Sequence, residues 1–223
     1  MGISKAWDWE RETGAIWREP SEEAYYLAAR WKGLGYRTLL DFGCGLGRHA
    51  VYFAKQGFKV SAFDLSDKAV ASTERWAAEE KLPIRAEVGD MLCPPYGDGS
   101  FDCVFAYHVI SHTDTQGARA IMAQIGRILR PGGEAFLTLC SKDAWSYREA
   151  GFPRLDENTV VKTEEGPENG IPHFFVSMDD LLQLLDGFEL ERVRHIDDCW
   201  FGGQQQGGRH YFVLARRPGR EKA

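Results

Sequence analysis

The chain has 223 residues, enough to bury a sizeable hydrophobic core, and is expected to form a single domain over residues 1–223. Hydrophobic residues make up 43% and charged residues 27%, as in ordinary globular proteins, and no apolar run reaches the ~20 residues that span a bilayer. The formal net charge of −6 gives no electrostatic basis for binding nucleic acid, so neither a nucleic acid nor a membrane is expected as a partner.

The five cysteines are scattered along the chain and never form a Cys-x-x-Cys pair. This usage is typical of reduced thiols and argues against a disulfide framework or a zinc ribbon. The N-terminal stretch MGISKAWDWERETG lacks the apolar core of a signal peptide. We therefore expect a cytoplasmic protein. The sequence carries no signal for an oligomeric state.

Strands alternate with helices over the first 140 residues, and Ser21 is expected to cap the first helix. Helices are predicted at residues 22–33, 47–57, 67–81 and 115–130, and strands at 37–43, 58–66, 84–90, 101–110 and 134–140. Alternation of this kind indicates βαβ units in a parallel, doubly wound sheet. The runs CVFAYHVI and AFLTL are apolar on both faces, as in central strands that helices cover on both sides.

The pattern changes after residue 140. Residues 141–176 are rich in Pro, Gly, Glu and aromatic side chains and show no clear period. A helix is then predicted at 177–187, followed by strands at 188–196 and 209–217 that the loop 202–208 joins. Two consecutive strands without a helix between them indicate an antiparallel hairpin at the edge of the sheet.

The stretch DFGCGLGRHA places Gly43, Gly45 and Gly47 between a predicted strand and a predicted helix. Glycines at this point let the backbone approach a nucleotide cofactor closely. In the dinucleotide fingerprint G-x-G-x-x-G the third glycine comes one position later, where this chain has Arg48. Asp41, an acid, directly precedes the loop. A dinucleotide site and a plain structural turn are the alternatives at this point.

Together with the segments that follow, this loop resembles the first motif of the class I S-adenosylmethionine-dependent methyltransferases. Asp64 closes the second strand in FDLS, and Asp90 follows the third strand in VGDM, as in that family. FDCVFAYHVISH and RILRPGG resemble the family's strand-four segment and the segment before strand five. The resemblance runs in order over residues 35–140 and continues more loosely to 216. It implies S-adenosylmethionine as the cofactor and S-adenosylhomocysteine as its product.

The resemblance implies a role for each acid of the site. Asp64 would accept hydrogen bonds from the ribose hydroxyls, and Asp41 would orient the ammonium group, directly or through water. Asp90 would meet the adenine amino group, while backbone N–H groups of the loop would face the cofactor's carboxylate. A solvated surface acid is the alternative for Asp64, and core packing is the alternative for Leu65. The cofactor-binding candidates are Asp41, Gly43, Gly45, Gly47, Asp64, Leu65, Asp90, Met91 and Tyr107.

The fold that follows is α/β: a Rossmann-like, doubly wound, seven-stranded and mainly parallel sheet with a C-terminal antiparallel hairpin and a small aromatic cap. Residues 1–34 would form an N-terminal cap and helix, and residues 35–140 the cofactor-binding core. Residues 141–176 would form a substrate-cap insertion, and residues 177–216 the final helix and strands. In such sheets ligands bind at the carboxyl ends of the strands, which both cap segments could roof.

The tetrad CPPY, which begins at Cys93, is similar to the D/N/S-PP-Y/F/W motif of enzymes that methylate the amino groups of DNA bases. Cys93 has no oxygen to accept a hydrogen bond from such an amine. The tetrad also precedes the predicted fourth strand, whereas the DNA motif follows it. We therefore predict a proline-shaped loop here and exclude a DNA-amine site.

His108 and His112 lie at and just after the end of the predicted fourth strand, next to the expected position of the methyl group. Both are candidate catalytic bases, because the unperturbed pKa of histidine is about 6.5, and a structural hydrogen-bonding role is the alternative. Six aromatic residues could line the site of a small, partly apolar acceptor or pack the N-terminal helix. They are Trp9, Trp17, Tyr25, Trp145, Tyr147 and Phe174.

No metal site is expected from the sequence. The stretches HTD at 112–114 and HIDDC at 195–199 are the candidates, and neither supplies the set of oxygen ligands that Mg²⁺ requires. The predicted function is S-adenosylmethionine-dependent methyl transfer to an O, N or S atom of a small-molecule acceptor. Methylation of RNA or protein, and a non-catalytic S-adenosylmethionine-binding module, are the alternatives.

Overall fold

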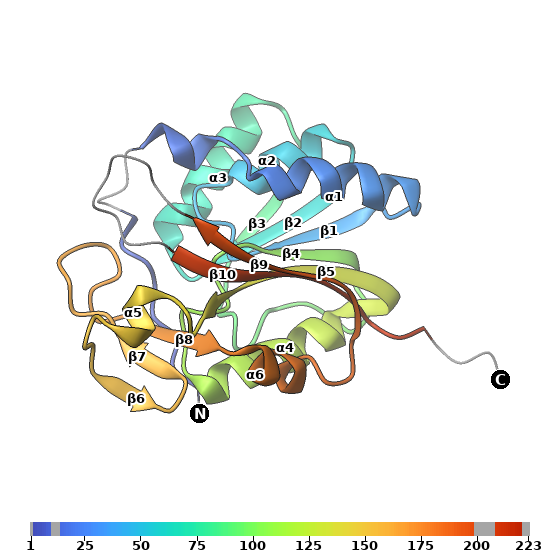
Figure 1. The fold of residues 1–223 in the computed structure, drawn as a ribbon. Coiled ribbons are helices and arrows are strands. Elements are labelled where there is room, and N and C mark those ends of the chain that lie inside the picture. The colour runs from blue at the N-terminus through green and yellow to red at the C-terminus, as the bar shows by residue number, and fades with distance from the viewer. Residues whose placement is uncertain (1, 10–13, 199–207, 220–223) are drawn as a thin grey trace.

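The computed structural model describes residues 2–9, 14–198 and 208–219 and contains a central, mainly parallel sheet (Figure 1). Parallel strands follow the order β3-β2-β1-β4-β5, and β10 and β9 continue the sheet in antiparallel pairing beyond β5. These strands are β1 (Thr38–Phe42), β2 (Lys59–Asp64), β3 (Arg85–Val88), β4 (Phe101–Ala106), β5 (Leu129–Ser141), β9 (Glu189–Asp198) and β10 (Gly208–Arg216). The predicted doubly wound α/β fold with its C-terminal antiparallel hairpin is confirmed.

Helices cover both faces of this sheet (Figure 1). One face carries α1 (Glu22–Gly33), α2 (Arg48–Lys55) and α3 (Asp67–Glu79), and the other carries α4 (Thr115–Ile128) and α6 (Met178–Leu184). A short 3₁₀ helix, η2 (Ala15–Arg18), precedes α1. No helix in the described part of the chain is both long enough and apolar enough to span a bilayer.

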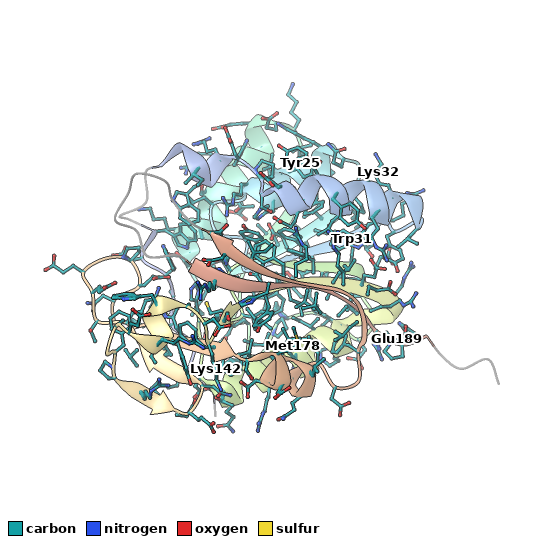
Figure 2. All side chains as sticks on the ribbon, in the orientation of Figure 1. Tyr25, Trp31, Lys32, Lys142, Met178 and Glu189 are labelled. Carbon is teal, nitrogen blue, oxygen red and sulfur yellow. The ribbon has the colours of Figure 1, made fainter. Side chains whose placement is uncertain are left out.

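Helix α1 shows how the sequence directs a helix onto the sheet. Its buried residues Ala24, Leu27, Ala28 and Trp31 recur at the helical spacing of three and four. Trp31 is fully buried and points toward the sheet, whereas Lys32 is exposed and points outward (Figure 2). The helix therefore buries one apolar stripe and leaves its polar face in solvent.

A buried polar contact connects α1 to strand β5. Glu134 on β5 is only 1% exposed, and its carboxylate accepts two hydrogen bonds from the Arg30 guanidinium at 2.7 and 2.9 Å. The indole N–H of Trp31 donates to the same carboxylate at 2.9 Å. These donors compensate the cost of burying the Glu134 charge.

The expected cap insertion, residues 141–176, contains regular elements that the sequence pattern did not indicate. They are α5 (Trp145–Arg148), β6 (Arg154–Asp156), β7 (Thr159–Val161) and β8 (Pro172–Val176). Strand β8 pairs in parallel with the end of β5 through Cys140 and Ser141, and β7 and β6 follow it in antiparallel pairing. This three-stranded extension brings Lys162, Glu168 and His173 close to His112, which follows β4.

Two local predictions need correction. The predicted strand 101–110 ends at Ala106, because His108 has a left-handed backbone with φ of 53° that a strand cannot contain. Ser21 occupies the N-cap position of α1, but its side chain makes no capping hydrogen bond; its backbone N–H donates to Nε2 of His49 instead. The predicted loop 202–208 falls almost entirely outside the described residues.

Candidate active site

A cavity of about 350 Å³ lies at the carboxyl ends of β1, β2 and β4. The residue directly after each of these strands lines the cavity: Gly43, Leu65 and Tyr107. The N-terminal segment contributes further lining residues, and so does the insertion through Lys162 and His173. This is the position where doubly wound sheets bind ligands, and the volume falls within the range of small-molecule sites, roughly 300–1,000 Å³.

The loop after β1 requires glycine for two reasons. Gly43 and Gly45 have φ angles of 73° and 52°, in the left-handed region that favours glycine. A Cβ atom added at Gly45 would also lie 2.7 Å from the ring of Trp9, and one at Gly43 would lie 2.3 Å from Val109. Gly47 does not line the cavity; it is the N-cap residue of α2 and packs against Thr73.

Asp64 lies at the end of β2 and lines the cavity. Its Oδ2 atom accepts a hydrogen bond from the N–H of Gly45 at 2.9 Å, and its Oδ1 atom accepts one from the N–H of Ser66 at 3.0 Å. Burial raises the pKa of Asp64, while these backbone donors oppose the rise. Because a carboxylate has about four lone-pair sites, Asp64 retains acceptor capacity toward the cavity.

Asp41, on β1, is buried beneath the glycine loop and is not itself a lining residue. Burial raises its pKa to about 7, and the charge of Arg48 and a backbone hydrogen bond from Ala50 oppose that rise. Its Oδ2 atom is buried without a hydrogen-bond partner. This one oxygen therefore lacks a hydrogen-bonding partner, which the ammonium group of an amino acid could supply.

The predicted adenine side of the cavity is lined by Phe63, Leu65, Gly89 and Met91. Asp90 is not among the lining residues; its Oδ1 atom accepts a hydrogen bond from the N–H of Leu92 at 2.9 Å. The structure thus brings Leu65 and Met91 together with Asp64, whereas Asp90 closes the turn behind them.

Tyr107 and Arg48 form one wall of the cavity. Burial raises the pKa of Tyr107 to about 12, so its phenol is neutral at physiological pH. The Arg48 guanidinium lies 5.6 Å from the Tyr107 ring and 5.1 Å from the Trp17 ring, and it donates to the carbonyl oxygen of Ile16 at 3.0 Å. Arg48 therefore connects the glycine loop to the N-terminal segment.

Three tryptophans of the N-terminal segment roof the cavity. Trp7, Trp9 and Trp17 all line it, and their rings contact one another at centroid distances of 5.2 to 6.4 Å. Of the six aromatic residues expected at the acceptor site, only Trp9 and Trp17 are in the lining.

The other four expected aromatics lie elsewhere, which corrects the prediction. Tyr25 is 56% exposed on α1, and Phe174 belongs to the hydrophobic core beside α4 and α6. Tyr147 packs on Phe175, and Trp145 packs on Phe152 within the insertion. Their sequence separation from the strand ends does not reveal which way each side chain points.

The two predicted catalytic histidines both line the cavity. The backbone N–H of His108 donates to Oγ1 of Thr138 at 2.6 Å, and the His108 ring contacts the ring of His210 at 4.5 Å. The His112 ring contacts the rings of Trp7 and His173 at 5.3 and 4.9 Å. Burial lowers the pKa of His108 well below its usual range and that of His112 to about 3, so both imidazoles are neutral at pH 7.

Several polar residues of this site were not predicted, among them Lys162, Glu168, His173 and His210. Glu168 forms an ion pair with Lys162, and its Oε1 atom lies 3.1 Å from Nε2 of His173. Burial raises the pKa of Glu168, but the hydrogen bond and charge of His173, together with Lys162, hold it well below its usual range. His173 belongs to a sequence segment without hydrophobic periodicity. Its position in the cavity therefore becomes clear only from the pairing of β7 with β8.

The arrangement fits S-adenosylmethionine. Asp64 offers free acceptor capacity to a ribose diol, and Leu65 and Met91 offer apolar walls to an adenine ring. The Asp41 oxygen that lacks a partner could accept a hydrogen bond from an ammonium group. The backbone of the loop approaches the cavity closely because glycines occupy the positions where a Cβ atom would clash. The cavity thus has a cofactor half around Asp64 and a histidine half around His112.

Comparisons with known proteins agree with this geometry. Residues 39–133 match the family model of a methyltransferase domain. A ubiquinone biosynthesis O-methyltransferase of Caulobacter vibrioides is 35% identical over 107 residues, which cover 47% of this chain and 41% of that protein. An ajmaline N-methyltransferase of Rauvolfia serpentina is 35% identical over 164 residues, which cover 72% of this chain and 54% of that protein. The chain therefore spans about half the length of these relatives, or less.

A solved structure of an S-adenosylmethionine-dependent methyltransferase from Methanosarcina mazei has the same fold. Its TM-score is 0.70 at 21% identity, and the superposition covers 82% of this chain and 92% of that one. Residues 39–133 are thus similar to a methyltransferase domain, and the chain shares its fold with this methyltransferase. The match over residues 39–133 agrees with the resemblance predicted from the sequence.

Proposed function

We propose that this protein transfers a methyl group from S-adenosylmethionine to an O, N or S atom of a small-molecule acceptor. The observation that supports the proposal is that Asp64 and His112 line the same cavity. One half carries groups suited to an adenosine, and the other carries neutral imidazoles beneath a tryptophan roof.

S-Adenosylmethionine supplies, when bound, an electrophilic methyl group on a positively charged sulfur. The chain's own contribution is to hold and align the two reactants, which accounts for much of the rate of such a displacement. Asp64 holds the ribose hydroxyls, Asp41 compensates the ammonium charge, and Leu65 and Met91 flank the adenine. Asp90, which lies behind this wall, would reach the adenine amino group only if its turn rearranged.

His108 and His112 are the proposed groups that face the acceptor. A neutral imidazole offers a lone pair that can accept a hydrogen bond from the acceptor and so hold its polar atom in place. Trp7 covers this half of the cavity, because its ring lies against His112, while Trp9 covers Gly45 of the glycine loop. The acceptor is thereby kept in contact with the methyl group rather than with solvent.

Two relatives support a small acceptor. Their names give ubiquinone biosynthesis and ajmaline as the context of an O- and an N-methylation. We extend only the class of acceptor to this chain, since cap segments differ among proteins that share one fold. A cytoplasmic location, expected from the cysteine usage and the N-terminus, stays a prediction.

The test is S-adenosylhomocysteine formation by the purified full chain with S-adenosylmethionine and a cell extract separated by molecular mass. We expect turnover in the low-mass fraction, and the Asp64→Ala variant serves as the control that lacks the ribose acceptor. Turnover confined to the macromolecular fraction would instead support an RNA or protein acceptor. Cofactor binding without turnover in either fraction would support a non-catalytic binding module.

A further inference from the structure

Three side chains of metal-ligating type converge in the histidine half of the cavity. The candidate ligand atoms of His112, Glu168 and His173 all lie within 4.8 Å of one another. Oε1 of Glu168 lies 3.1 Å from Nε2 of His173 and 3.9 Å from Nε2 of His112. His112 follows β4, whereas Glu168 and His173 come from the insertion, His173 on β8 and Glu168 in the loop before it. Only the folded chain brings the three side chains together.

These separations are close to those of a metal site. Two ligands held at 2.0–2.1 Å from a tetrahedral ion lie about 3.4 Å apart. The distances from Glu168 to the two histidines lie on either side of that value. Small side-chain rotations would therefore place all three atoms around one ion without a change in the backbone.

The side chains are also oriented by partners behind them. Nδ1 of His173 donates to the carbonyl oxygen of Ile171 at 3.0 Å, and Nε2 faces Glu168. The proton that Nε2 shares with Glu168 would leave when an ion binds. Lys162 pairs with Oε2 of Glu168 and leaves Oε1 directed at the histidines. In most protein metal sites a ligating histidine donates its other ring N–H to a carbonyl or carboxylate in this way, which fixes the orientation of the ring.

The surroundings suit an exchangeable ion. The Trp7 ring covers His112 at 5.3 Å, while all three ligand residues line the cavity. Three protein ligands leave further coordination positions, and these would open toward the acceptor space. Two imidazoles and one carboxylate favour Zn²⁺ or a similar first-row transition metal over Mg²⁺ or Ca²⁺, which prefer all-oxygen sites.

We propose that His112, Glu168 and His173 bind a divalent transition-metal ion that holds an oxygen of the methyl acceptor. This assignment rests on the proposed methyltransferase function and replaces the sequence-based expectation of no metal site. The acceptor would then be a hydroxyl compound. Its O–H bond breaks with the proton leaving to water, its oxygen forms a bond to the methyl carbon, and the carbon–sulfur bond breaks with the electron pair remaining on sulfur.

The test measures binding of Zn²⁺ alone to the full chain after chelator treatment, by calorimetry near neutral pH. We expect one Zn²⁺ per chain, and an affinity that falls more than about tenfold in Glu168→Gln and in His173→Ala. His195→Ala is the matched control, because His195 is exposed on β9 and bonds to Ser141 outside the cluster. His173 is buried in a strand, so His173→Ala could fail to fold. Glu168→Gln keeps the shape of a partly exposed loop side chain, so it tests the site even in that case.

Co²⁺ substitution adds a spectroscopic readout. Nitrogen and oxygen ligation predicts visible bands without the sulfur-to-metal charge-transfer band that Cys140, which also lines the cavity, would produce. Equal Zn²⁺ affinity in wild type, Glu168→Gln and His173→Ala, or the absence of stoichiometric binding, would overturn the site. Titration of the metal-free chain with S-adenosylhomocysteine tests the proposed function separately, so the two failures are distinguishable.

Discussion

Replacing Asp64 by alanine should weaken cofactor binding without unfolding the protein. The carboxylate already accepts N–H groups of Gly45 and Ser66 at 2.9 and 3.0 Å, and its remaining lone pairs face the cavity. A hydrogen bond to a charged group contributes about 1.5–3 kcal/mol, so the dissociation constant of S-adenosylhomocysteine should rise about 10- to 150-fold. Calorimetric titration of the full chain measures this change directly.

Asp67→Ala is the matched control for that experiment. Asp67 is an exposed acid in the first turn of α3, three positions beyond Asp64, and it does not line the cavity. Removing it subtracts the same charge and leaves the proposed ribose acceptor in place. Unchanged affinity in a folded Asp64→Ala protein, or an equal loss in Asp67→Ala, would refute the role of Asp64.

Three further variants test other parts of the structure. Gly45→Ala places a Cβ atom 2.7 Å from the Trp9 ring at a φ of 52°. Denaturant unfolding of this variant should show a stability about 1–3 kcal/mol lower, together with a changed tryptophan emission. Wild-type stability and emission would contradict this. Burial raises the pKa of Asp41 to about 7, so the folded chain holds a proton that the unfolded chain, with a pKa near 3.9, releases. Stability of the ligand-free protein should therefore fall as pH rises from about 4 toward 7, and Asp41→Asn should flatten this slope in thermal unfolding; an unaltered slope would exclude Asp41 as its source. Glu134→Ala leaves the buried Trp31 N–H without its acceptor and removes the buried partner of Arg30, which keeps its ion pair with Glu191 at 3.5 Å. This change should cost about 3 kcal/mol in urea unfolding, whereas a loss under about 1 kcal/mol would show that the contact is dispensable.

The sequence predicted the sheet because each of its elements carries a local signal. Helix α1 occupies the predicted residues 22–33, where acidic residues begin the helix and apolar residues recur at helical spacing. Strand β4 is apolar on both faces and lies at the centre of the sheet as predicted. Its length was overestimated, because the left-handed backbone at His108 has no signature in an apolar run.

The cofactor half of the cavity was also accessible from the sequence. The glycines and Asp64 lie at strand ends, and parallel strands place their carboxyl ends at one edge of the sheet. Asp90 shows the limit of this reasoning: its neighbours Gly89 and Met91 line the cavity, while its own side chain closes a turn. Position along a strand end gives the edge of the sheet, but the local turn decides the side chain's direction.

The histidine half was only partly predictable. His112 was a candidate because it follows β4, but Glu168 and His173 belong to a segment without hydrophobic period. Strands β7 and β8 form there through pairing with each other and with the end of β5, a long-range contact that no short window of sequence contains. Which aromatic residues roof the cavity was hidden for the same reason.

A crystal structure of the full chain with S-adenosylhomocysteine tests the two-part cavity most directly. We predict the adenosine between Asp64 and Met91, the amino acid moiety over the glycine loop, and the sulfur directed toward His108 and His112. Adenosine bound in the histidine half, or a sulfur directed away from both histidines, would contradict the assignment of this cavity as a methyl-transfer site.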